Sequence, residues 1–162
     1  MNKPILYILC GLPGSGKSTW AHKCISKNFE KDIRYISRDE IRFSMLKENE
    51  DYFSHENTVF TKFVKTIANI LIDGFDVIAD ATHLNKRSRR KLTDAIDIIY
   101  KDYNIIYIIF KTPLEVCIYR NNYRCGRARV PEETIRNMMI NFDYPNLTED
   151  FRAIDVIQIE GE

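Results

Sequence analysis

The chain has 162 residues, of which 44% are hydrophobic and 29% charged, and its formal net charge is +1. This length fits one domain, and no apolar run approaches the roughly 20 residues that a membrane helix needs. A net charge so close to zero also excludes a protein that coats nucleic acid through bulk electrostatics. An apolar run that starts at Ile5 leaves no room for a secretory signal, and the cysteines lack zinc-ligand spacing. We therefore expect a cytoplasmic protein with free thiols and no membrane partner.

The first feature along the chain is a strand followed by a glycine-rich loop and a helix. The run Ile5–Cys10 is long enough for one buried strand, and apolar residues recur at helical spacing after Lys17. The loop between them matches Gly-x-x-x-x-Gly-Lys-Ser, whose N–H groups and lysine bind a polyphosphate and whose serine binds Mg²⁺. A chance match within a simple turn is the alternative, which this context disfavours. The residues expected to bind ATP or GTP here are Gly11, Pro13, Gly14, Ser15, Gly16, Lys17, Ser18 and Thr19.

Strand-like and helix-like segments then alternate along the whole chain. The expected strands are Ile5–Cys10, Ile33–Ser37, 76–81, 105–110 and Ala153–Ile159. The expected helices are 17–28, 39–47, 54–73, 86–101, 113–123 and 131–142. Such alternation predicts an α/β P-loop fold of the adenylate-kinase-like type, a five-stranded parallel sheet flanked by helices. We expect a single domain over 1–162, with a lid at about 120–131.

Asp39 follows the second expected strand, at the edge where an open parallel sheet binds its ligands. One interpretation is structural, because Ser37 and Glu40 fit a helix capping box. Asp39 is then a first-turn carboxylate and Arg42 is its ion-pair partner. In the other interpretation Asp39 is a general base and Arg42 binds a phosphate of the acceptor. The phosphate loop favours the second, since a carboxylate beside a γ-phosphate repels it unless it accepts a proton.

Two further segments follow the third and fourth strands. Asp80 ends the third strand and is expected to help bind Mg²⁺ through water. The run 86–91 holds five basic residues, which are either a solvated helix face or a contact to a nucleic acid backbone. After the fourth strand, Arg120, Arg124 and Arg127 are spaced as a lid that neutralises charge on the γ-phosphate. Arg127 is the candidate for the arginine closest to the transferred group.

Four segments together resemble the 5′-OH polynucleotide kinases, both the phage-type and the bacterial RNA-repair kinase domains. These segments are residues 11–21, 37–42, 80–85 and 120–127. The resemblance implies Mg²⁺-dependent transfer of the γ-phosphate of ATP to the 5′-OH end of RNA or DNA. It spans nearly the whole chain. His83 departs from it, because better-known members tend to carry asparagine there, and we expect no partner phosphatase or ligase domain within these 162 residues.

The same resemblance implies a role for each matching residue. Lys17 and Ser18 match the family's phosphate-loop pair, Asp39 its general base, and Arg42 the arginine that binds the 3′-phosphate of the terminal nucleotide. The nucleotide-clamping arginines and the segment after the third strand are matched by Arg120, Arg124, Arg127, Asp80, Thr82 and Asn85. We therefore expect Asp39, Lys17 and Arg127 to be catalytic and Arg42, Thr82 and Asn85 to bind the acceptor.

Two other function classes stay open on the sequence. A kinase of a small metabolite, nucleoside or antibiotic needs the same base without a nucleic acid site. An NTP-hydrolysing switch or binding module is the second, although such proteins usually carry a group that orients water rather than a base for a hydroxyl. RNA against DNA as acceptor, and a monomer against a homo-oligomer, are not decided by the sequence.

Overall fold

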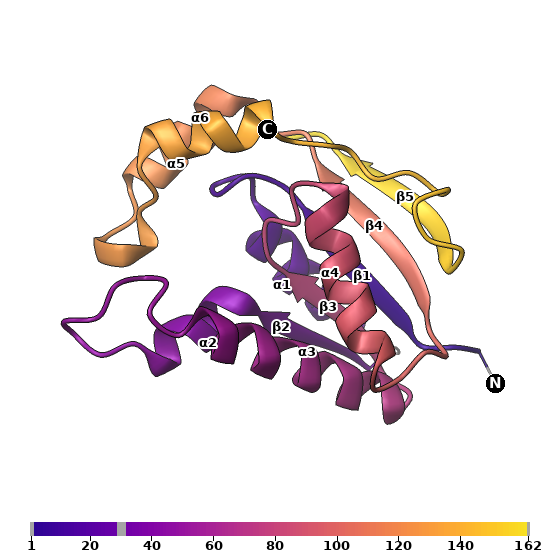
Figure 1. Ribbon diagram of the computed structural model, residues 1–162. Coiled ribbons are helices and arrows are strands. Elements are labelled where there is room, and N and C mark those ends of the chain that lie inside the picture. Colours follow the sequence, from indigo (N-terminus) through magenta and orange to yellow (C-terminus); the bar gives the residue numbers. More distant parts are fainter. Residues whose placement is uncertain (1, 29–31, 162) are drawn as a thin grey trace.

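The computed structural model describes residues 2–28 and 32–161 of the chain. Its strands form one parallel sheet in the order β2–β3–β1–β4–β5 (Figure 1). The strands are β1 (Ile5–Cys10), β2 (Ile33–Ser37), β3 (Asp76–Asp80), β4 (Asn104–Phe110) and β5 (Ala153–Ile159). The predicted five-stranded parallel sheet is confirmed, and each expected strand agrees with the structure to within one residue at either end.

Helices cover both faces of this sheet and one of its ends. They are α1 (Lys17–Lys27), α2 (Arg38–Met45), α3 (Glu56–Ile72), α4 (Lys86–Asp97), α5 (Leu114–Asn122), the 3₁₀ helix η1 (Gly126–Ala128) and α6 (Glu132–Ile140). Helices α3 and α4 lie on one face and α1 on the other, while α5 and α6 lie beyond the carboxyl ends of the strands (Figure 1). Helix α4 is shorter than predicted, because the chain turns back after Asp97 and the Tyr103 hydroxyl donates to that carboxylate at 2.9 Å.

The core has two layers, as expected for strands whose side chains point alternately to opposite faces. The larger layer packs β1, β3 and β4 against α3 and α4, with members such as Ile8, Phe63 and Leu92. The smaller layer packs Leu9 and its neighbours against α1. A third cluster joins the glycine-rich loop to α5 and α6 through Leu12, Cys117, Ile118 and Ile135. The loop is thereby attached to α5, the helix that carries Arg120 and precedes the other lid arginines.

The parallel register brings the three predicted segments to one edge of the sheet. Because β2, β3 and β1 are adjacent, the residues after them meet at their carboxyl ends. Ser37 pairs with Asp80 in the β2–β3 register, so the segments that follow leave the sheet side by side. Within the described part of the chain, no helix is long and apolar enough to cross a membrane.

Candidate active site

The glycine-rich loop has the backbone that a phosphate site needs. Gly14 and Gly16 have φ angles of 80° and 94°, in the left-handed region that side chains rarely adopt. A Cβ atom on Gly14 would lie only 2.4 Å from the carbonyl oxygen of Cys117 in α5. Glycine at this position therefore lets α5 approach the loop closely, and Gly16 directly precedes the N-terminus of α1.

Lys17 is buried beneath the loop. Its Nζ donates to the carbonyl oxygens of Gly11, at 3.0 Å, and Leu12, at 2.8 Å. Burial lowers the pKa of this ammonium, and the carboxylates of Asp80 and Asp39 act in the opposite direction. The charges of both carboxylates thus act on the lysine and favour its protonated form.

A cavity of about 480 Å³ opens in front of the loop. Its walls are the loop and the start of α1, Phe110 at the end of β4, and residues 159–161. Arg120 of α5 and Arg124, which follows that helix, also line it. The hydroxyl of Ser15 is buried and has no hydrogen-bond partner in the part of the chain that the structure describes. Left-handed glycines, a buried ammonium, two arginines and an unpaired hydroxyl fit a nucleotide polyphosphate.

The position expected for Mg²⁺ contains a tyrosine that the sequence analysis missed. The Tyr35 hydroxyl donates to the Asp80 carboxylate at 2.6 Å and also hydrogen-bonds to Ser18 and Ser37. Burial, together with Asp80, raises the pKa of Tyr35. Across the described residues, no three His, Cys, Asp or Glu side chains group as a metal site. Ser18 and Asp80 therefore fit Mg²⁺, which is commonly bound through one or two protein groups, water and phosphate oxygens.

Asp39 and Arg42 form an ion pair on the first turns of α2. The Ser37 hydroxyl accepts from the Glu40 N–H at 3.2 Å, so the predicted helix cap is present too. Arg42 is buried and also donates to Glu56 at 2.7 Å and to the Tyr52 hydroxyl at 2.7 Å. The Asp39 carboxylate accepts from that same hydroxyl at 2.6 Å and stays half-exposed.

This arrangement bears differently on the two predicted roles, Asp39 as general base and Arg42 as the group that binds an acceptor phosphate. Arg42 is occupied by two carboxylates and buried, which does not suit the predicted grip on an acceptor phosphate. The Asp39 side chain keeps about half of its surface exposed, and its charge acts on Lys17. The structure thus pairs Arg42 with Asp39 and Glu56 and leaves part of the Asp39 carboxylate open to solvent.

The loop after β3 is used mainly for structure. The Thr82 carbonyl accepts from the Gly11 N–H at 3.0 Å, which ties this loop to the phosphate loop. Asn85 caps α4, since its side-chain oxygen accepts from the Ser88 N–H at 2.9 Å and Ser88 returns a hydrogen bond. The acceptor role predicted for Thr82 and Asn85 is therefore not visible in these contacts.

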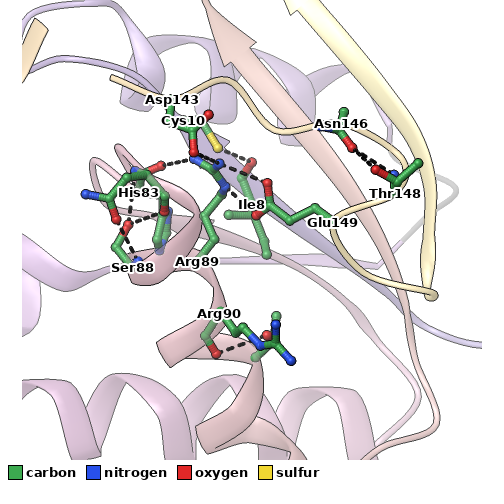
Figure 2. Close-up of polar contacts among 12 residues, drawn as sticks. Ile8, Cys10, His83, Ser88, Arg89, Arg90, Asp143, Asn146, Thr148 and Glu149 are labelled. Carbon is green, nitrogen blue, oxygen red and sulfur yellow. Dashed lines mark hydrogen bonds and ion pairs between the residues drawn. The ribbon is translucent and has the colours of Figure 1, made fainter. Parts of the chain in front are cut away.

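Arg89, from the basic run at the start of α4, points into the molecule (Figure 2). Its Nε and Nη2 donate to the buried Glu149 carboxylate at 2.7 and 2.9 Å, and its Nη1 donates to the His83 carbonyl at 2.9 Å. Neither the solvated face nor the nucleic acid contact predicted for this run applies to Arg89. A basic run cannot reveal from the sequence alone which of its members is buried.

His83 lies in the loop after β3 and is buried against β1. Its Nδ1 lies 2.8 Å from the Leu9 carbonyl oxygen, so this nitrogen carries the proton and donates. Burial lowers the pKa of His83 to about 4, which outweighs the raising effect of the Leu9 hydrogen bond. His83 is therefore neutral at physiological pH and cannot supply a positive charge to the site.

The lid places its arginines in two different environments. Arg120 and Arg124 line the cavity as predicted. Arg127 instead donates to the carbonyl oxygens of Lys47 and Glu50, both at 2.8 Å, in the loop between α2 and α3. The prediction that Arg127 sits at the transferred phosphate does not match this placement, whereas the positive charge of Arg124 acts on Lys17.

One further lid residue had no signal in the sequence. Asn121 is fully buried, and its side chain exchanges two hydrogen bonds with the backbone of Val130, at 2.7 and 2.9 Å. These bonds join the two ends of the lid, across nine residues of sequence. A buried asparagine within a polar stretch is not distinguishable from a solvated one by spacing.

Comparison with known proteins now adds a family. A family described as "AAA domain" matches residues 6–145, which is most of the chain. The chain belongs to this family. L-seryl-tRNA(Sec) kinase of Methanococcus maripaludis is 34% identical over 145 residues, which are 87% of this chain and 53% of that protein. The chain thus spans about half the length of this curated relative.

Two solved structures extend the comparison. A chain in the structure of the Pnkp1/Rnl/Hen1 RNA repair complex is 25% identical, with a TM-score of 0.73, over 87% of this chain and 44% of that one. Kti12 of Chaetomium thermophilum, in complex with ADP-AlF3, is 16% identical, with a TM-score of 0.69, over 96% of this chain and 88% of that one. At this identity the similarity shows only that the two chains share a fold. This AAA-family chain is therefore an α/β P-loop domain.

Proposed function

We propose that the chain is an ATP-dependent kinase that transfers the γ-phosphate to a primary hydroxyl at an end of a nucleic acid, first of all the 5′-hydroxyl of a polynucleotide. The observation that carries this proposal is the environment of the Asp39 carboxylate. It is half-exposed, it is held by Arg42 and Tyr52, and its charge acts on Lys17. A carboxylate in this place suits the removal of a proton from an alcohol.

The proposed reaction needs little covalent participation by the protein. The acceptor oxygen forms a bond to the γ-phosphorus, the bond between that phosphorus and the β–γ bridging oxygen breaks, and the acceptor proton passes to Asp39. Lys17 and Arg124 stabilise the charge on the phosphates. Ser18 and, through water, Asp80 would hold Mg²⁺, which would supply positive charge beside the phosphate oxygens. Arg42 and Tyr52 keep Asp39 oriented.

A second acceptor is supported by the archaeal relative, whose name describes a kinase of seryl-tRNA(Sec) at 34% identity. A seryl group on tRNA offers the same chemistry, because it is also a primary hydroxyl at the end of an RNA. The two acceptors differ in which end of the RNA carries the hydroxyl. The same residues serve both, with Asp39 as base, Lys17 and Arg124 on the phosphates and ATP as donor.

The test is an acceptor screen with γ-labelled ATP and Mg²⁺. The acceptors are 5′-OH RNA and DNA oligonucleotides, seryl-tRNA and a panel of small alcohols including nucleosides and sugars. Label on the oligonucleotides supports the first acceptor, and label on seryl-tRNA alone supports the second. Label only on a small molecule, or ATP hydrolysis that needs no acceptor, contradicts the proposal.

A further inference from the structure

The loop between α2 and α3, residues 46–55, is fixed from two sides and is called the acceptor loop from here on. Internally, the Glu50 carboxylate accepts from the Lys47 N–H at 2.9 Å and lies 2.9 Å from Nε2 of His55. Externally, Arg127 of the lid donates to two of its carbonyl oxygens. In Figure 1 this loop lies below the tip of the lid, on the same side of the molecule. The lid and the acceptor loop therefore hold each other in place.

This loop carries two of three aromatic rings that pack edge to face beside Asp39. The Tyr52 ring contacts those of Phe53 and Phe43, with centroid distances of 4.8 and 6.0 Å. Tyr52 is anchored, since its hydroxyl is shared between Asp39 and Arg42 and its ring lies 4.1 Å from the Arg42 guanidinium carbon. Phe53, by contrast, is 69% exposed, and Phe43 is also exposed. Apolar ring surface is thus held open to solvent one residue away from a contact to the base.

The chemistry of this surface favours the base of a nucleotide acceptor over its phosphate backbone. Exposed aromatic rings stack on the planar faces of bases, in a way that tolerates differences in sequence. The same loop contains Glu48, Glu50 and Asp51, whose negative charges disfavour a phosphate backbone. An uncharged planar ring therefore fits here better than a phosphodiester.

We propose that Phe43, Tyr52 and Phe53 form a stacking platform for the nucleobase of the nucleotide that carries the accepting hydroxyl. This inference rests on the proposed function and adds the substrate feature that the site recognises. It explains why the lid contacts the acceptor loop through Arg127, because a platform must be rigid to orient a base. It also separates the nucleotide acceptors from small alcohols without a ring.

The test compares two 5′-OH oligonucleotides that differ only in the terminal nucleotide, one normal and one abasic. With the unmodified protein, we expect kcat/KM to be about 5- to 100-fold higher for the normal acceptor, the range that stacking on one ring supports. In Phe53→Ala this preference should shrink to within about twofold, with the KM for ATP unchanged. Phe53→Tyr, which keeps a ring, should restore it.

Phe151→Ala is the matched control, because Phe151 is an exposed phenylalanine that lies before β5, away from the acceptor loop. It should keep the full preference for the normal terminus. Equal phosphorylation of normal and abasic acceptors by the unmodified protein overturns the platform while leaving the kinase proposal intact. No phosphorylation of either oligonucleotide, together with phosphorylation of a ring-free alcohol, overturns both. A preference that survives in Phe53→Ala and in Phe43→Ala also overturns the platform.

Discussion

Arg42 and Arg89 are both buried and pair with carboxylates, but the two carboxylates differ in how far they are exposed to solvent. The Arg89 side chain is 1% exposed and its partner Glu149 is 5% exposed. The Arg42 side chain is 5% exposed, but its partner Asp39 is 54% exposed. All three guanidinium nitrogens of Arg89 donate hydrogen bonds, whereas the buried Nε of Arg42 has no partner within the described residues.

The difference separates a closed pair from an open one. A closed pair joins segments distant in sequence, here the start of α4 and the segment before β5 (Figure 2). An open pair keeps one charge oriented and leaves it accessible to a ligand. A buried pair that loses one member leaves an uncompensated charge, which destabilises the fold, while an open one can lose activity alone. Stability and turnover should therefore respond in opposite ways at the two sites.

Asp39→Asn should have the largest effect, on turnover. The amide keeps the size of the side chain but cannot accept the acceptor's proton, so we expect kcat to fall by about 10²–10⁴-fold. ATP affinity, measured by equilibrium binding, should stay within about twofold. Asp94→Asn is the control, because Asp94 is an exposed helix aspartate that also pairs with an arginine. Loss of ATP binding or of folding in Asp39→Asn would instead give Asp39 only the structural role.

Arg89→Met should have the reverse profile. It leaves Glu149 buried and unpaired, and we expect the free energy of unfolding to fall by about 3–5 kcal/mol, measured by urea denaturation. The control is Arg136→Met, since Arg136 binds Glu115 and Glu132 at the surface and exposed pairs contribute only about 0–1 kcal/mol.

The double variant Arg89→Met/Glu149→Leu tests the cause of that loss. Removing both charges should recover much of the stability, because an apolar pair of similar volume often replaces a buried ion pair at little cost. If the double variant is as unstable as Arg89→Met alone, packing rather than the unpaired carboxylate explains the effect.

Arg89 also donates to the carbonyl oxygen of His83, and the side chain of His83 makes the stability of this region depend on pH. Its pKa in the folded chain is about 4, below the ordinary 6.5, because of burial. The unfolded chain therefore binds more protons between these values, so stability is full above about pH 6.5 and falls as the pH drops toward 4. The shift corresponds to at most about 3 kcal/mol.

His83→Asn should remove this pH dependence. Asparagine does not titrate, and it tolerates the left-handed backbone of this position, where φ is 44°. Urea denaturation of both proteins at several pH values between 4 and 7 measures the two slopes. Identical slopes would mean that another group causes the acid sensitivity.

The contrast also marks how far the sequence alone could lead. Ser37, Glu40, Asp39 and Arg42 interact within one helical turn, so their cap and ion pair follow from spacing. The sheet likewise follows from the period of apolar residues. Tertiary contacts do not follow from local spacing. Arg89 binds Glu149, which is 60 residues away in the sequence, and Arg127 binds the Lys47 carbonyl, which is 80 residues away. A local pattern cannot tell a charged residue that finds such a distant partner from one that faces solvent.

Asn85 gives the smallest expected effect, and it tests a contact within one helical turn rather than one between distant residues. Asn85→Ala removes a helix cap and should lower the free energy of unfolding by about 1 kcal/mol, while Asn85→Asp, which can still accept from Ser88, should retain most of it. Aspartate also adds a negative charge at a helix N-terminus, where it is favourable. If Asn85→Asp raises the KM for the acceptor while its stability stays intact, the Asn85 amide contacts the acceptor, as the sequence predicts. Unchanged acceptor kinetics in that variant would leave Asn85 a helix cap, as its contacts indicate.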